Sequence, residues 1–79
     1  MHIRYFAAAR AATGLDEEWV DVPDGYSVAD VAAVLSERHP SLATVLTRCS
    51  YLLDEVAVRE TSAPARGAML DVLPPFAGG

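Results

Sequence analysis

The chain has 79 residues, the size of one domain, and 52% of them are hydrophobic. Its 11 acidic and 6 basic residues give a formal net charge of −5, which argues against nucleic-acid binding because that function needs a basic surface. The single cysteine excludes an internal disulfide framework, and no apolar run approaches the roughly 20 residues that span a bilayer. We therefore expect a cytoplasmic protein without a membrane or nucleic-acid partner. One cysteine and two scattered histidines are also too few for a structural metal site.

The first quarter of the chain predicts two strands with a short helix between them. Apolar and polar residues alternate over residues 2–6 and again over 17–22, as they do in half-buried strands. The alanine-rich stretch 7–13 favours a helix, and Gly14 is suited to the position that ends it. We expect the two strands to pair as an antiparallel hairpin.

A longer helix is predicted over residues 27–38. Ser27 is a good N-cap, and Asp30 three residues later completes a variant of the capping box. Pro40 ends the helix. One face carries an apolar stripe with helical spacing, made of Val28, Val31, Ala32 and Leu35. This stripe should pack against a sheet.

The second half predicts a short helix and two more strands. Ser41 is expected to cap a helix over 42–46, and alternation predicts strands over 52–59 and 69–73, separated by the loop 60–67. In the last strand the two even-numbered aliphatic residues, Leu70 and Val72, should face inward and Asp71 outward. This order of elements predicts an α+β domain with a mixed sheet and one main helix across it. The first and last strands would be central and parallel, which is the β-grasp arrangement. We assign this domain to residues 1–73.

The last residues, 73–79, read Leu-Pro-Pro-Phe-Ala-Gly-Gly. Pro74 and Pro75 can continue neither a central strand nor a helix, so 74–79 should leave the domain as an extended tail with a stiff start and a flexible Gly-Gly end. Two terminal glycines bury no side chain, yet they place a carboxylate on a thin thread that can enter a narrow active site of another protein.

The rest of the chain offers little catalytic machinery. No Gly-rich loop followed by Lys-Ser/Thr is present to cradle a nucleotide, so the chain is expected to bind no cofactor itself. His2 and His39 are interpreted as surface or packing residues, and Cys49 as a small buried hydrophobe. The chain is therefore expected to be a protein substrate whose reactive group is its terminal carboxylate.

Two runs of charged residues and the single tryptophan are expected to lie on the surface. The runs 16–18 and 54–55 are interpreted as solvated charge. Trp19 should lie on the outer sheet face, either partly covered by Arg4 or Arg59 or exposed as an interface residue.

The opening 4–10, Arg-Tyr-Phe-Ala-Ala-Ala-Arg, and the closing 71–79 resemble the small subunit of molybdopterin synthase, a ubiquitin-like β-grasp sulfur carrier. The resemblance implies that an E1-like enzyme uses ATP to adenylate the carboxylate of Gly79, and that a sulfur donor then converts it to a thiocarboxylate. It further implies that this tail enters the large synthase subunit and gives sulfur to cyclic pyranopterin monophosphate, forming molybdopterin.

The resemblance also implies roles for the tail residues. Gly78 and Gly79 would let both partners close around the reacting atom, and Phe76 would anchor the tail in an apolar pocket. The remaining partner contacts would be Leu73, Pro74, Pro75 and Ala77.

Three alternatives remain open at this point. One is a sulfur carrier of another pathway, for thiamine, cysteine or tRNA thiolation. Another is a ubiquitin-like modifier that is joined through Gly79 to lysines of other proteins. The third is an interaction module that uses an edge strand or the outer sheet face.

Overall fold

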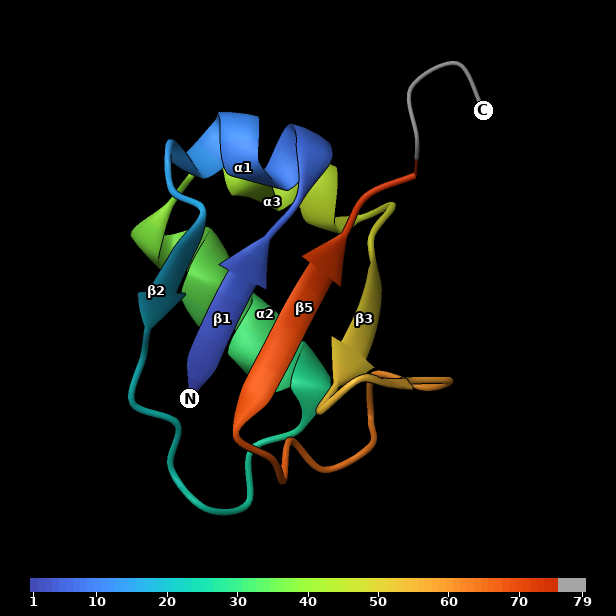
Figure 1. The fold of residues 1–79 in the computed structure, drawn as a ribbon. Coiled ribbons are helices and arrows are strands. Elements are labelled where there is room, and N and C mark those ends of the chain that lie inside the picture. Colours follow the sequence, from blue (N-terminus) through green and yellow to red (C-terminus); the bar gives the residue numbers. More distant parts are fainter. Residues whose placement is uncertain (76–79) are drawn as a thin grey trace.

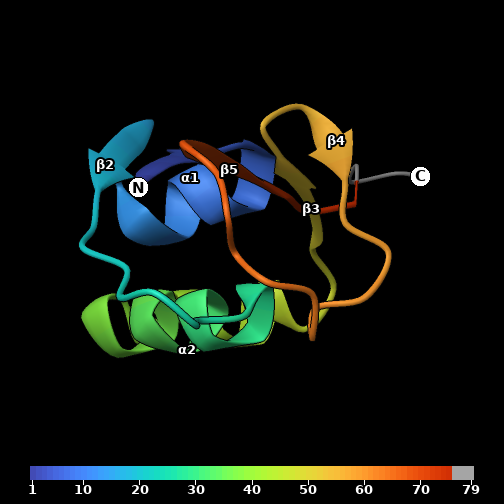
Figure 2. The same cartoon turned by 90° about the horizontal axis from the view of Figure 1, so that it is seen from below.

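The computed structural model describes residues 1–75, and the predictions made for residues 76–79 lie outside it. A five-stranded sheet with the order β2-β1-β5-β3-β4 forms one layer, and α2 crosses one of its faces (Figures 1 and 2). The elements in chain order are β1 (His2–Tyr5), α1 (Ala7–Thr13), β2 (Glu17–Trp19), α2 (Val28–Arg38), α3 (Leu42–Leu46), β3 (Ser50–Leu53), β4 (Val56–Ala57) and β5 (Met69–Leu73). The predicted α+β class and mixed sheet are confirmed.

The parallel pair of β1 and β5 is the centre of the fold. Tyr5 of β1 pairs with Val72 of β5, and β3 lies antiparallel on the other side of β5. Because β1 and β5 are parallel, the chain enters the sheet at one end and leaves it at the other (Figure 1). The predicted placement of the first and last strands is confirmed.

The main helix begins where its capping residues predict. Ser27 Oγ accepts a hydrogen bond from the Asp30 amide at 3.1 Å, and the Asp30 carboxylate accepts one from the Ser27 amide at 2.9 Å. This pair satisfies two amides that a helix start leaves without a partner. The stripe residues Val28, Val31 and Leu35 are fully buried, as predicted.

The short helix α1 and its end also agree with the sequence. Gly14 ends it with a φ of 73°, a left-handed conformation that glycine adopts at low cost. By contrast, Ser41 makes no side-chain capping bond to α3, so that prediction is wrong. Ser41 is itself in the right-handed helical conformation, from which its hydroxyl does not cap.

The single strand predicted over 52–59 is wrong. The chain turns at Asp54 and Glu55, whose φ angles are 48° and 69°, and it divides into β3 and β4. The Asp54 carboxylate is not merely solvated, because it accepts hydrogen bonds from the amides of Ala68 and Met69 at the start of β5. A Cβ at Gly67 would lie 2.5 Å from this carboxylate, which explains the glycine there.

The strand predicted over 17–22 is also shorter than expected, because β2 ends at Trp19. Val20 is nevertheless buried, and Val22 packs against the core. The core lies between the sheet and α2 and contains Ile3, Tyr5, Ala9, Val20, Val28, Val31, Leu35, Leu42, Tyr51, Leu70 and Val72. Within residues 1–75, no helix is long and apolar enough to cross a membrane.

Candidate functional site

The candidate site begins at the C-terminal end of β5, at Leu73. Leu73 pairs with Ser50 of β3, and the Phe6 amide donates a hydrogen bond to the Val72 carbonyl at 3.3 Å. Pro74 is buried and Pro75 is exposed. The sheet therefore holds the chain up to Leu73, and Pro75 is the first exposed residue after it. The boundary between the domain and its tail at residue 74 stays a prediction, as do the roles of Phe76, Ala77, Gly78 and Gly79.

An ion pair couples β1 to β5 just before the chain leaves the sheet. Arg4 Nε lies 2.6 Å from Asp71 Oδ1, and Arg4 Nη2 lies 2.7 Å from Oδ2, which makes the pair bidentate. The two residues are direct neighbours in the parallel register. Hydrogen bonding to Asp71 raises the pKa of Arg4.

The position of Asp71 corrects part of the sequence analysis. It lies on the outer face, as predicted, but only 3% of its surface is exposed. The Arg4 guanidinium lies 5.6 Å from the centre of the Phe6 ring, and that ring is partly exposed beside the end of β5. Nothing in the sequence separation of 67 residues could have indicated this ion pair.

Aromatic rings occupy the other end of the outer face. Trp19 is 69% exposed, and its ring stacks on His2 with 4.4 Å between centroids. His2 Nε2 lies 3.0 Å from Glu17 Oε1. The outward position of Trp19 is confirmed, whereas the ring that covers it belongs to His2 and not to either predicted arginine.

A second hidden carboxylate lies on the inner face. Glu18 accepts a hydrogen bond from the Tyr5 hydroxyl at 2.6 Å, and its other close neighbours are His39 Nε2 at 2.6 Å and Arg38 Nε at 3.2 Å. Its side chain is only 10% exposed, so the interpretation of 16–18 as solvated charge is wrong at this residue.

Two opposed effects set the pKa of Glu18. Burial raises it, but the hydrogen bonds from Tyr5 and His39 and the charges of His39 and Arg38 outweigh burial and hold the pKa below its usual value. Burial and the bond to Glu18 raise the pKa of Tyr5. This network joins β1, β2 and the end of α2, so its role is to hold the fold together.

Cys49 lies beside the start of β3, next to the residue that pairs with Leu73. Its thiol donates a hydrogen bond to the Val45 carbonyl at 3.2 Å. Burial raises the pKa of the thiol, which is therefore protonated at neutral pH. Cys49 is only partly buried, so the prediction of a buried residue is wrong, although its side chain does pack against the core.

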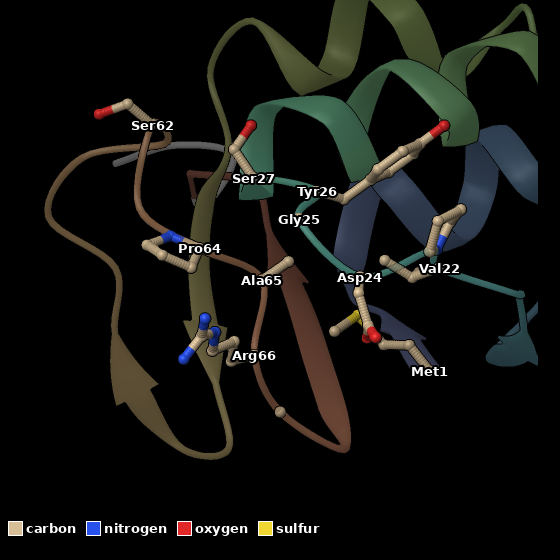
Figure 3. Close-up of a pocket in the computed structure, with 12 residues that line it drawn as sticks. Met1, Val22, Asp24, Gly25, Tyr26, Ser27, Ser62, Pro64, Ala65 and Arg66 are labelled. Carbon is tan, nitrogen blue, oxygen red and sulfur yellow. The ribbon is translucent and has the colours of Figure 1, made fainter.

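A cleft of about 650 Å³ lies at the far end of the molecule, between the loops 22–27 and 62–67 (Figure 3). Met1 and Asp24 lie on one side of it and Arg66 on the other. The amide of Ala65 bonds to the Tyr26 carbonyl and ties the two loops together at 2.8 Å. Sequence reasoning did not find this cleft, and it lies at the end of β5 away from the tail. Within residues 1–75, no cluster of metal-ligating side chains is present at either end.

Comparisons with known proteins agree with this geometry. Residues 3–79 match the ThiS family. The molybdopterin synthase sulfur carrier subunit of Chlamydomonas reinhardtii is 30% identical over 79 residues, covering 98% of this chain and 95% of that protein.

Solved structures give the same picture. Small archaeal modifier protein 1 of Haloferax volcanii superposes with a TM-score of 0.79 at 25% identity, covering 95% of each chain. A chain from the complex of subunits 1 and 2 of the molybdopterin-converting factor of Helicobacter pylori superposes with a TM-score of 0.69 at 20% identity, covering 99% of this chain and 96% of that one. These findings confirm the β-grasp fold and the resemblance seen in the sequence, and the chain belongs to the ThiS family.

Proposed function

We propose that this chain is the sulfur carrier subunit of a molybdopterin synthase and that it carries sulfur as a thiocarboxylate on Gly79. The observation that carries the proposal is the position of the Pro-Pro-Phe-Ala-Gly-Gly segment directly after β5, the strand between β1 and β3. The relative from Chlamydomonas reinhardtii, which matches over almost the whole chain, bears the name of this subunit.

The terminal carboxylate must be activated before sulfur can be attached to it. A carboxylate is a poor acceptor for a nucleophile, because its oxygen is a poor leaving group. Adenylation by an ATP-dependent partner would turn that oxygen into part of AMP, which a sulfur nucleophile can displace from the acyl carbon of Gly79. The resulting thiocarboxylate is an anionic sulfur nucleophile at neutral pH. The chain would thus bring the sulfur, while the catalytic groups would belong to its partners.

The described residues would contribute by holding the base of the tail in place. The bidentate Arg4–Asp71 ion pair and the hydrogen bond from the Phe6 amide to the Val72 carbonyl fix the last residues of β5 before Pro74. A rigid base lowers the entropy lost when a partner captures the tail. We expect the large synthase subunit to bind the tail and the outer face, where Phe6 is exposed beside the end of β5 and Trp19 at the opposite end.

The decisive experiment measures the intact mass of the chain after incubation with ATP, sulfide and the host's E1-like enzyme. We expect a mass increase equal to the replacement of one oxygen by sulfur, localised to Gly79 by fragmentation. Deletion of Gly79 should abolish sulfur transfer and molybdopterin synthesis, yet leave the free energy of unfolding within about 0.5 kcal/mol of the original.

The control separates lost chemistry from lost stability. Gly25→Ala places a side chain at a φ of 90°, far from the tail, and should lower stability while sulfur loading persists. A Gly79 deletion variant that still supports molybdopterin synthesis would refute the proposal.

Two alternatives have distinct results in the same assay. Loading with sulfur but no conversion of cyclic pyranopterin monophosphate in the presence of the large subunit would indicate another sulfur pathway. The likeness to small archaeal modifier protein 1 favours a protein modifier as the second candidate. Peptides in which Gly79 is joined to lysines of other proteins would identify that function.

A further inference from the structure

All six basic residues of this chain are arginines, and the sequence contains no lysine. They are Arg4, Arg10, Arg38, Arg48, Arg59 and Arg66. Lysine is among the commonest residues of soluble domains, so this is a marked departure from average usage. The two side chains differ in reactivity as well as in shape. A lysine amine loses its proton readily enough to attack acyl groups, whereas the arginine guanidinium stays protonated.

In a sequence without lysine, the amine to consider is the α-amino group of Met1. It donates a hydrogen bond to the Val20 carbonyl at 2.6 Å and is partly buried. Met1 precedes β1 and lies beside the cleft of Figure 3, whereas the tail leaves beyond the other end of the parallel strand β5. The five residues of β5 separate the two ends by roughly 15 Å at the usual strand rise.

The strongest nucleophile near the tail is the thiol of Cys49. Ser50, the next residue, pairs with Leu73, so Cys49 lies at the end of the sheet from which the tail leaves. Its proton is held in a hydrogen bond to the Val45 carbonyl, and its side chain is partly buried against the core. Since the thiolate and not the thiol is the nucleophile, this site is a poor acceptor at neutral pH.

We infer that the folded domain presents no reactive acyl acceptor to an activated Gly79, whether its own or that of a second copy. The inference rests on the proposed activation of Gly79. Attack by an amine would form an amide bond, expel the leaving group with its electron pair and release one proton from nitrogen. Such an amide would remove the acyl carbon from sulfur chemistry. With arginine at every basic position, an activated C-terminus survives until a sulfur donor or a partner takes it.

The inference also limits the second candidate function. Attached to lysines of other proteins, this chain would offer no lysine on which a further copy could be built. Each modified lysine would therefore carry a single copy.

The test uses the full chain with Gly79 as a mercaptoethanesulfonate thioester, released from an intein fusion, so that no activating enzyme is needed. The thioester is incubated at neutral pH and followed by intact mass and by denaturing gel. The original chain should convert only to the free acid. Arg48→Lys places an amine on an exposed residue next to Cys49, two residues before the partner of Leu73, and we expect amide formation at least about tenfold faster.

Arg66→Lys is the matched control, because Arg66 is equally exposed but lies at the far end beside Met1. Its amide product should be mainly intermolecular and should increase with protein concentration. Amide formation through Met1, or a stable thioester on Cys49, at the rate of the Arg48→Lys variant would overturn the inference. Equal rates for Arg48→Lys and the original chain would also overturn it. Because the thioester is made without ATP, failure of sulfur loading in the earlier assay would refute the proposed function and leave this result standing.

Discussion

The two faces of the sheet are built on different principles. The inner face is covered by α2, and its strand residues Ile3, Leu70 and Val72 are fully buried. No helix of residues 1–75 covers the outer face (Figure 2), where Trp19 is exposed and Asp71 is buried in an ion pair with Arg4. Packing against a helix thus stabilises one face, and a side-chain network organises the other. The covered face supplies most of the buried core, and the open face leaves a large aromatic side chain exposed.

The largest loss of stability is expected from a substitution on the inner face, which α2 covers. Leu70→Ala removes a fully buried side chain from the middle of β5. We expect it to lower the free energy of unfolding by about 3 kcal/mol, because a cavity remains where the side chain packed. Urea denaturation would show a lower midpoint with an unchanged slope. A loss below about 1 kcal/mol would mean that the inner face is less tightly packed than the burial of Leu70 indicates.

The neighbouring residue tests the open face in the same strand. Asp71→Asn keeps the shape of the side chain but replaces one acceptor oxygen of the Arg4 pair with an amide group. We expect a loss of about 1–2 kcal/mol in the free energy of unfolding, which is smaller than that of Leu70→Ala. Glu37→Gln on the exposed side of α2 is the control and should change stability by less than about 0.5 kcal/mol. If Asp71→Asn matched this control, the ion pair would not organise the outer face.

The smallest expected change in stability concerns Glu18, whose carboxylate lies on the inner face. The pKa of Glu18 is lower in the folded chain than its ordinary value of 4.5, so the native state holds the proton less tightly than the unfolded state does. The stabilising contribution is therefore present above pH 4.5 and is lost as the pH falls through the folded pKa.

Glu18→Gln should cost roughly 1 kcal/mol at neutral pH, since the hydrogen bonds from Tyr5 and His39 lose their charged acceptor. The difference between the variant and the original chain should shrink as the pH is lowered. Urea midpoints measured across that range would check it. A difference that does not change with pH would show that the charge of Glu18 contributes nothing.

Local signals predicted most of the fold. The capping pair of Ser27 and Asp30, the left-handed end at Gly14 and the alternation in β5 each act within a few residues, so the sequence carries them directly. These signals were enough to predict the helix, the last strand and the parallel centre of the sheet.

The wrong predictions concern residues whose backbone conformation or burial depends on contacts with residues far away in the sequence. Asp54 and Glu55 adopt positive φ although neither is a glycine, and the Asp54 carboxylate is held there by amides 14 and 15 residues away. Glu18 looked solvated because Tyr5, Arg38 and His39 meet it only in the folded chain. At the candidate site, the end of the last strand at Leu73 was predicted from sequence, whereas the Arg4–Asp71 pair beside it was not.

The place of β5 between two partner strands has a mechanical consequence. A pull on Leu73 along the axis of β5 would run across the direction of the hydrogen bonds to β1 and β3. The load is then shared by both ladders in shear and is not concentrated on one bond at a time, as it would be in a peeling edge strand. The domain should therefore resist a pull on the C-terminal end of β5 better than it would if β5 were an edge strand.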